Sequence, residues 1–361
     1  MSSFYLNVHD LFIAWAESLP PEVASILNRR FEPFGHIDVP VPKSPDLILS
    51  PLTAPPSITG AGRQMEALYG FWVTSYREEP ALIFFRKGAV DLMVTLSEPM
   101  HIFFRPRAGI AGKLHTALTF CLKMVLSQKG RLFAHGAVLR HRDQCLIIAG
   151  QRGIRKTQLV LTLLHHGWHY LADDKFILDR GVARRYQQRV LLRDHHFDAL
   201  PWLGQRTPGY DTFKKAAPWR KRGRTLARNL LHKKLLPSED RLFNRGLQPT
   251  IENLFPENPR LETVIPSQVI LLYNGPEPST VRLSSAEGVR DLTLMQQLAY
   301  EEFSGMEWML GLYDKRALSD YSGLIQSNLP PACIFFKMIV PEGQPPEALI
   351  NEVNTCLQSA S

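Results

Sequence analysis

The sequence predicts an α/β protein with a mixed sheet and flanking helices. Short β-branched and aromatic runs alternate with segments that have the period of amphipathic helices. One run, residues 145–150, is apolar throughout, which is typical of a strand buried on both faces of a sheet. The chain has 361 residues, of which 45% are hydrophobic, so it can bury a sizeable core.

Composition also limits the classes of protein to which the chain can belong. There is no run of 18 apolar residues, so we expect no transmembrane helix. The N-terminus lacks a basic stretch followed by an apolar core and does not have the pattern of a signal peptide. The four cysteines have no C-x-x-C spacing, which favours reduced thiols over disulfides or a metal site. We therefore expect a cytoplasmic protein.

The first half of the chain is expected to contain loops, strands and one long helix. Prolines punctuate residues 1–80, where we expect loops and short strands around a possible helix at 9–18. Leucine recurs at every fourth position in 110–129, which predicts a helix that Gly130 could end. Three runs rich in β-branched and aromatic residues predict antiparallel strands at 81–87, 89–97 and 100–106.

The second half is expected to alternate strands and helices. A hairpin of 132–140 and 145–150 precedes a helix at 157–166. Further strands are predicted within GWHYLADD (167–174) and KFILDRG (175–181) and at 267–274 and 332–340, and helices at 285–303 and 345–357. We expect a proline-rich N-terminal region (1–80), a central domain (81–310) and a C-terminal strand and helix (311–361).

Positive charge is concentrated in one stretch. Residues 184–245 hold 16 Lys and Arg against 5 Asp and Glu, a net charge of +11 in a chain whose total is +8. Such a stretch favours an anionic partner such as a nucleotide, an acidic peptide or a nucleic acid, although it could equally be a solvated insertion. Trp202, Tyr210 and Trp219 are interleaved with the charges, but no nucleic-acid-binding module is recognisable, so we regard nucleic acid as an unlikely partner.

The segment after the buried strand carries the pattern of a phosphate-binding loop. The sequence IIAGQRGIRKTQLVL (147–161) supplies Gly150, Gly153, Lys156 and Thr157. In such a loop the main-chain amides point at an anion, the lysine meets the outer phosphates and the hydroxyl ligates magnesium. The loop lies between a predicted strand and a predicted helix, which is where this geometry functions.

Two carboxylates follow the next predicted strand. Asp173 and Asp174 end the segment LADD, and a carboxylate at this place can hold magnesium or accept a hydroxyl proton. The alternative is a turn with acidic side chains. His135 lies in the first strand of the predicted hairpin and is either a site residue or a histidine whose hydrogen bonds are satisfied on a strand.

These residues resemble the ATP-binding segment of the HPr kinase/phosphorylase family. The resemblance covers AHGAVLRHRDQCLIIAGQRGIRKTQLVLTLLHHGWHYLADDKFIL (134–178), with an H-G pair, a hairpin, a loop close to G-x-x-G-x-G-K-S/T, a helix ending near H-G and a D-D pair. It implies a P-loop fold shared with phosphoenolpyruvate carboxykinase, ATP and Mg²⁺ as cofactors, and phosphorylation of a serine hydroxyl on a protein or peptide. The basic stretch 184–245 would recruit an acidic peptide or small protein as the acceptor, and the chain could form a homo-oligomer.

The resemblance also implies roles for individual residues. Lys156 would bind the β and γ phosphates, Asp173 would be the general base, and His135 would lie beside the phosphates. Thr157 and Asp174 would hold the metal. The residues expected to bind the nucleotide are Gly150, Gln151, Arg152, Gly153, Ile154, Arg155, Lys156, Thr157 and Gln158. An R-G-L triplet of the family could match Arg245, Gly246 and Leu247, at a longer distance from the loop.

Two residues depart from the family pattern. Arg155 stands where a glycine precedes the lysine, and if the backbone there needs a positive φ the side chain adds strain of about 1–3 kcal/mol. Arginine could compensate by turning outward or by reaching an anion. Gln158 stands where a small or acidic residue is commoner. The sequence thus predicts an ATP-dependent serine kinase, with a catalytically inactive module that binds a peptide or protein through its basic surface as the alternative.

Histidine pairs near the loop could suggest a metal centre. His165, His166 and His169 flank the end of the loop helix, and His195 and His196 lie in the basic stretch. No acidic or cysteine partner has the spacing of a zinc ligand, so the sequence argues against zinc.

Overall fold

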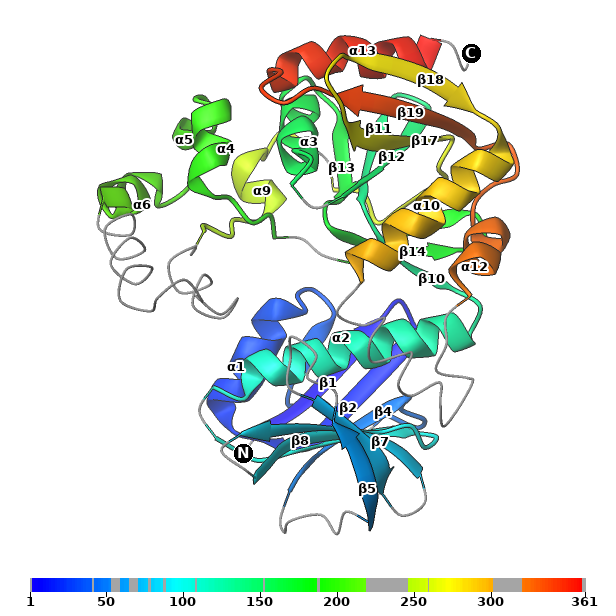
Figure 1. Cartoon of the computed structure of the whole chain (residues 1–361). Helices are drawn as coiled ribbons and strands as arrows, with labels where there is room; N and C mark the ends of the chain where they lie inside the picture. The colour runs from blue at the N-terminus through cyan, green and yellow to red at the C-terminus, as the bar shows by residue number, and fades with distance from the viewer. Residues whose placement is uncertain are drawn as a thin grey trace. The chain divides into compact units, whose positions relative to one another are not determined.

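The computed structural model divides the protein into two compact units (Figure 1). Unit 1 comprises Met1–His135, Ile177–Arg180 and Thr293–Leu329, and unit 2 comprises Gly136–Phe176, Gly181–Leu292 and Pro330–Ser361. The structure describes residues 2–40, 42–52, 59–64, 71–76, 79–86, 89–107, 109–151, 153–186, 189–218, 246–258, 260–300 and 320–358.

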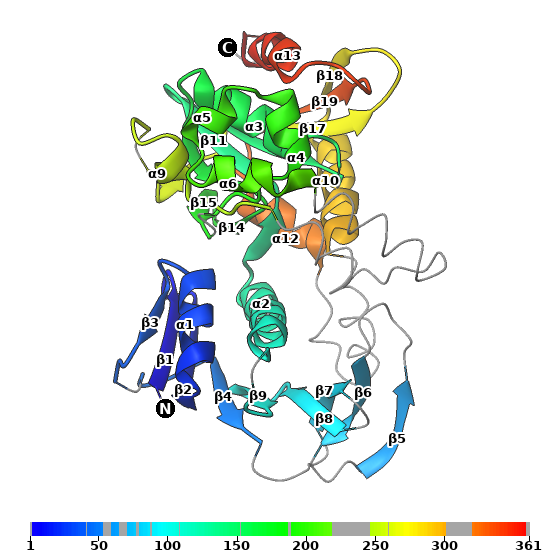
Figure 2. The same cartoon turned by 90° about the vertical axis from the view of Figure 1, so that its left-hand side faces the viewer.

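Unit 1 is built on a nine-stranded sheet of order β3-β1-β2-β4-β9-β8-β7-β6-β5 (Figure 2). Most neighbours are antiparallel, but β4 runs parallel to both β2 and β9. The strands are β1 (Ser2–Val8), β2 (Phe12–Leu19), β3 (Gly35–Ile37), β4 (Leu47–Pro51), β5 (Thr59–Gln64), β6 (Phe71–Tyr76), β7 (Glu79–Arg86), β8 (Ala89–Thr95) and β9 (Met100–Phe104). The three strands predicted between 81 and 106 are thereby confirmed as β7, β8 and β9.

Helices α1 (Pro21–Arg30) and α2 (Ala111–Gln128) cover this sheet. The helix predicted at 110–129 is confirmed as α2, and Gly130 follows it with a φ of +68°. Unit 1 also holds α12 (Tyr321–Asn328), β10 (Leu132–His135) and most of β14 (Lys175–Asp179), which lies beside β10. Asp91 on β8 is buried and forms ion pairs with Arg107 at 2.5 Å and Lys113 at 2.8 Å.

The N-terminal region differs from its prediction. The segment expected to be a helix at 9–18 is mostly strand β2, in which Phe12, Ala14 and Ala16 are buried while the residues between them are partly exposed. That two-residue period belongs to a strand, and pairing with β1 satisfies its main-chain groups. The predicted domain boundary at residue 80 falls inside β7, and the units are discontinuous in sequence where the prediction had continuous domains.

Unit 2 is built on a six-stranded mixed sheet of order β13-β11-β12-β17-β19-β18. Strands β12, β17 and β19 are parallel to one another, and β11 is antiparallel to both β12 and β13. The strands are β11 (Ala137–His141), β12 (Gln144–Gly150), β13 (His169–Ala172), β17 (Gln268–Asn274), β18 (Ser279–Leu283) and β19 (Ile334–Val340). The prediction of a fully buried strand at 145–150 is confirmed, because every residue from Cys145 to Gly150 is buried.

Helices lie on both faces of this sheet, so the mixed α/β architecture is confirmed. Helix α3 (Lys156–His165) packs with α13 (Pro346–Gln358) over β11, β12, β18 and β19. The start of α10 (Ser285–Ala299) lies against the other face, where the Cα of Gly288 approaches the ring of Phe335. Outside the sheet, β15 (Val182–Arg185) pairs with β16 (Thr263–Val264).

The basic stretch is only partly described. Four short helices lie in or next to it: α4 (Asp194–Ala199), α5 (Leu203–Arg206), α6 (Tyr210–Lys215) and α9 (Ile251–Leu254). The sequence TLARNLLHKKLL (225–236) also predicts a helical piece in this stretch, but it lies outside the described residues. Among the helices that the structure describes, none combines the length and the apolar character needed to cross a bilayer.

Candidate functional site

The predicted phosphate-binding loop follows β12, in the middle of the unit 2 sheet. Gly150 ends this strand, and a Cβ atom there would lie 2.8 Å from Ile154 Cγ2 and 3.0 Å from Leu272 Cβ. Both distances are shorter than a carbon–carbon contact allows, so the close approach of the loop to β17 requires glycine at this position. Ile154 is buried and fixes the loop against the sheet.

The loop turns into α3 through two residues with positive φ. The amide of Ile154 donates to the carbonyl of Gln151 at 3.3 Å, which closes the turn. Gly153 has a φ of +90°, and Arg155, at the N-cap of α3, has a φ of +66° and a ψ of +21°. The left-handed region is costly for any residue except glycine. The backbone at 155 therefore has the conformation that a glycine would adopt without strain.

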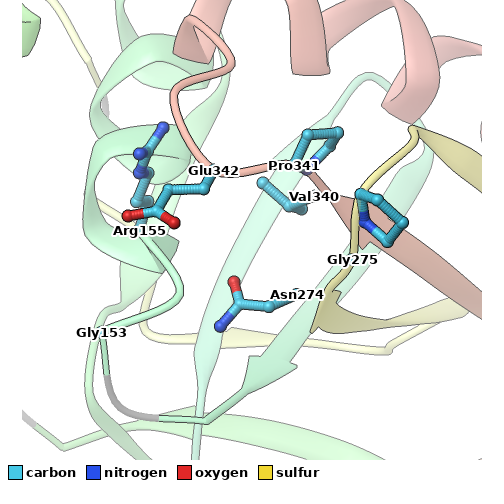
Figure 3. A pocket seen from close by; sticks show the side chains of 8 residues that line it. Gly153, Arg155, Asn274, Gly275, Val340, Pro341 and Glu342 are labelled. Atoms are coloured by element: carbon cyan, nitrogen blue, oxygen red, sulfur yellow. The ribbon is translucent and has the colours of Figure 1, made fainter.

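The Arg155 side chain turns toward the chain segment that follows β19. Its Nη1 donates to the main-chain carbonyl of Gln344 at 3.0 Å. Figure 3 shows the side chain above the loop, with the carboxylate of Glu342 on the same side. The arginine is thus held by the protein itself, by a contact that ties the loop to the connection between β19 and α13.

The first two residues of α3 face the predicted carboxylates. Thr157 Oγ1 donates to Asp173 Oδ2 at 3.0 Å. Lys156 is only 9% exposed, and burial lowers the pKa of its ammonium group, while the negative charges of Asp173 and Asp174 act to raise it. The structure therefore brings a cation, a hydroxyl and two carboxylates together at the start of one helix.

Sheet topology explains how residues so far apart in sequence meet. Because β11 is antiparallel to both β12 and β13, those two strands point the same way and their carboxyl ends lie at one edge of the sheet. The loop leaves that edge from β12, and Asp173 leaves it from β13. Asp173 is buried and Asp174 is exposed with a φ of +84°; the carbonyl of Asp174 accepts from the amide of Gly136 at 3.1 Å.

The end of α3 and one residue of its first turn are held by structural contacts. Gln158, predicted to bind nucleotide, is buried and donates from Nε2 to the carbonyl of His195 at 3.2 Å. The helix ends in a Schellman motif, in which Trp168 N donates to Leu163 O at 3.1 Å around Gly167 with a φ of +84°. The Gln158 contact links the loop helix to α4 of the basic stretch.

A cavity of about 640 Å³ adjoins the loop (Figure 3). Its walls come from the loop, from the end of β17 and from the end of β19, which all lie at the same edge of the sheet. The lining residues are Gly153, Arg155, Asn274, Gly275, Pro276, Val340, Pro341 and Glu342. Ligands bind at this edge of open α/β sheets, outside the carboxyl ends of parallel strands.

Sequence reasoning missed the side of the site that faces this cavity. Asn274 is the last residue of β17 and Glu342 is the second residue after β19, two strands that the sequence predicts at 267–274 and 332–340. Their signal was a polar residue close to Gly and Pro at a strand end. That signal indicates a site only when β17 is known to lie beside β12 and β19 beside β17, all three being parallel.

The main chains of His135 and Leu247 have defined partners, and two other predicted residues lie outside the described part. His135 ends β10 in unit 1, where its amide donates to Gln296 Oε1 at 2.6 Å and its carbonyl accepts from Gln296 Nε2 at 2.9 Å. Arg152 and Arg245 lie outside the described residues. Leu247 donates its amide to Leu192 O at 2.9 Å, a bridge that holds the basic stretch together.

The histidines near the loop helix have structural partners. The ring of His165 stacks on Trp202 with a centroid distance of 4.2 Å. His196 Nδ1 accepts from the amide of Arg193 at 2.9 Å. Across the described ranges, no group of three or more His, Cys, Asp or Glu side chains is arranged to hold a metal ion.

The sequence was compared with families, curated proteins and solved structures. No family model matches the chain, and no curated protein matches it. Among solved structures, the Hpr(Ser) kinase/phosphatase from Coxiella burnetii aligns with 63% of this chain and 99% of its own, at 11% sequence identity and a TM-score of 0.32.

Proposed function

We propose that the protein is an ATP-dependent kinase of the HPr kinase type, which transfers the γ-phosphate to a serine hydroxyl on a protein or peptide. The observation that carries the proposal is the hydrogen bond of 3.0 Å from Thr157 to Asp173, next to the buried Lys156, at the start of a helix that follows a glycine-rich turn. A phosphate-binding loop needs these groups in this order.

Lys156 would bind the β and γ phosphates. Its ammonium group is buried, and burial alone disfavours the charged form, so nearby negative charge stabilises it. The phosphates of a bound nucleotide would add to the charge that Asp173 and Asp174 already supply. The amides of the loop residues from Gly150 to Gln158 would surround the same phosphates, helped by the positive end of the α3 dipole.

Thr157 and Asp174 are the proposed ligands of Mg²⁺. Hydroxyl and carboxylate oxygens are the donors that this ion prefers, and Mg²⁺ is commonly held by one or two protein groups together with substrate phosphates. The small number of protein ligands at this edge of the sheet fits that mode. When bound, the ion would neutralise charge on the phosphates.

Asp173 is the proposed general base. Its Oδ2 accepts from the Thr157 hydroxyl, which keeps the carboxylate oriented toward the first turn of α3. An acceptor serine placed at this point could pass its proton to the carboxylate as the γ-phosphate is transferred. His135 is proposed to lie beside the phosphates, a role that the resemblance to the family supplies.

The acceptor is proposed to be an acidic peptide or small protein. The described part of the basic stretch is linked to the loop helix through the contact of Gln158 with His195. A positively charged surface next to a kinase site would attract such an acceptor and raise its rate of association.

The test is transfer of labelled phosphate from ATP to acidic serine peptides in the presence of Mg²⁺. We expect wild-type protein to transfer the label, Asp173→Asn to keep ATP binding but lose transfer, and Lys156→Ala to lose both. Lys43→Ala, which removes an exposed lysine of unit 1, is the control and should behave as wild type. Unchanged Mg²⁺-dependent ATP binding by Lys156→Ala would refute the proposal.

Arg155 favours a second candidate function, a catalytically inactive module that holds a peptide or protein partner through its basic surface. Its side chain occupies space at the loop and is tied to Gln344. For this candidate we expect no transfer of label by wild type but retained binding of acidic peptides. A gain of ATP affinity in Arg155→Gly would indicate a nucleotide site that this residue impairs.

A further inference from the structure

We infer that the cavity beside the loop binds the nucleoside part of the nucleotide, and that Asn274 selects adenine there. This inference rests on the proposed kinase function, because it concerns the same nucleotide. The inference assigns recognition of the base to the cavity, because contacts of the loop with phosphates alone do not distinguish one base from another.

The position of the cavity supports the inference. Asp173 comes from β13, on one side of β12, whereas the cavity lies at the ends of β17 and β19, on the other side. Gly153 and Arg155 belong both to the loop and to the cavity wall. A nucleotide whose phosphates are bound by the loop would therefore direct its γ-phosphate toward the acceptor on one side and its nucleoside into the cavity on the other.

The chemistry of the lining fits an uncharged, planar group. Arg155, the cation of the lining, belongs to the loop, where the phosphates would be, whereas the Glu342 carboxylate would disfavour phosphate in its own part of the cavity. Gly153 and Gly275 present no side chain, and Pro276, Val340 and Pro341 supply apolar surface on which a ring can lie. The volume of about 640 Å³ is within the usual range for small-molecule sites.

Asn274 supplies the selectivity. It ends β17, and Figure 3 shows its carboxamide reaching into the cavity. A carboxamide carries a donor and an acceptor side by side, which matches the N6 and N7 edge of adenine; guanine presents two acceptors at the same edge. The Glu342 carboxylate is an acceptor for the ribose hydroxyls, the role that acidic residues have in dinucleotide sites.

The experiment measures the affinities of the full-length protein for ATP, GTP and inorganic tripolyphosphate with Mg²⁺. For wild type we expect ATP to bind on the order of tenfold more tightly than GTP. Asn274→Ala should weaken ATP binding on the order of tenfold, abolish the preference over GTP and leave tripolyphosphate unchanged. The matched control is Asn354→Ala, which removes an exposed carboxamide of α13 and should match wild type. Glu342→Gln should narrow the preference for ATP over 2′-deoxy-ATP.

Each outcome decides the inference. ATP affinity of Asn274→Ala within twofold of wild type, or a parallel loss for tripolyphosphate, would overturn it. If Asn274→Ala does not fold, the wild-type series decides, because equal affinity for ATP, GTP and tripolyphosphate is incompatible with a base site. Failure of the proposed function looks different: Lys156→Ala would then keep its affinity for tripolyphosphate, whatever the behaviour of Asn274→Ala.

Discussion

The conformation of Arg155 gives the sharpest prediction, which concerns the stability of two variants at that position. Its φ of +66° costs a non-glycine residue about 1.5 kcal/mol, and its hydrogen bond to Gln344 returns about 1 kcal/mol. Arg155→Ala removes the bond but keeps the strain, so we expect a loss of about 1 kcal/mol. Arg155→Gly relieves the strain as well, at an entropic cost of about 0.7 kcal/mol, and should stay close to wild type.

The measurement is thermal unfolding of both variants. We expect Arg155→Gly to be more stable than Arg155→Ala by about 0.8 kcal/mol, or about 2–3 °C in Tm. The control pair is Asn351→Ala and Asn351→Gly at an exposed position of α13, where alanine should be the more stable by about 1 kcal/mol. If Arg155→Ala proves as stable as Arg155→Gly, the backbone there is not strained and the reasoning is wrong.

Three further predictions concern named side chains. Although burial opposes ionisation of Asp91, its contacts with Arg107 and Lys113 lower the pKa of this carboxyl group to about 2. The ionised carboxylate therefore contributes fully to stability above the pKa of the unfolded state, and this contribution disappears as pH falls toward 2. Asp91→Asn should therefore cost about 2 kcal/mol in urea unfolding at pH 7 and much less near pH 2; equal costs would contradict this. Burial and the neighbouring His195 lower the pKa of His196 to about 3, so as pH falls His196 is protonated in the unfolded chain before it is protonated in the folded protein. Stability should therefore fall as pH drops from 6.5 toward 3. His196→Asn should reduce this dependence of stability on pH. Thr157→Val removes the hydrogen bond to Asp173, so it should lower stability by about 1 kcal/mol and weaken Mg²⁺-dependent ATP binding. A variant with unchanged stability and ATP affinity would argue against the contact.

Local sequence patterns predicted much of the fold. The leucine period of α2, the apolar run of β12 and the turn between β11 and β12 each depend on residues close together in sequence, and all three are confirmed. The segment predicted as a helix at 9–18 mostly forms strand β2, because it pairs with β1 and its side chains are buried alternately. Pairing with a distant strand overrides local propensity.

The residues of the candidate site also fall into those that lie close together in sequence and those that only strand pairing brings together. Loop residues from Gly150 to Thr157 follow one another in sequence, and Asp173 comes from a strand soon after, so their spacing carried the prediction. Asn274 and Glu342 reach the same edge of the sheet only through long crossovers, of 117 residues from β12 to β17 and of 59 residues from β17 to β19. No local pattern reports such a pairing.

The position of β19 has a consequence for biosynthesis. This strand comes last in the chain, yet it lies between β17 and β18. A growing polypeptide cannot complete the sheet beneath the loop until β19 has left the ribosome, and until then β17 has an open edge that could pair with another molecule. Premature termination before residue 334 should thus give aggregates in the cell, and newly made protein should depend on chaperones until β19 has been translated.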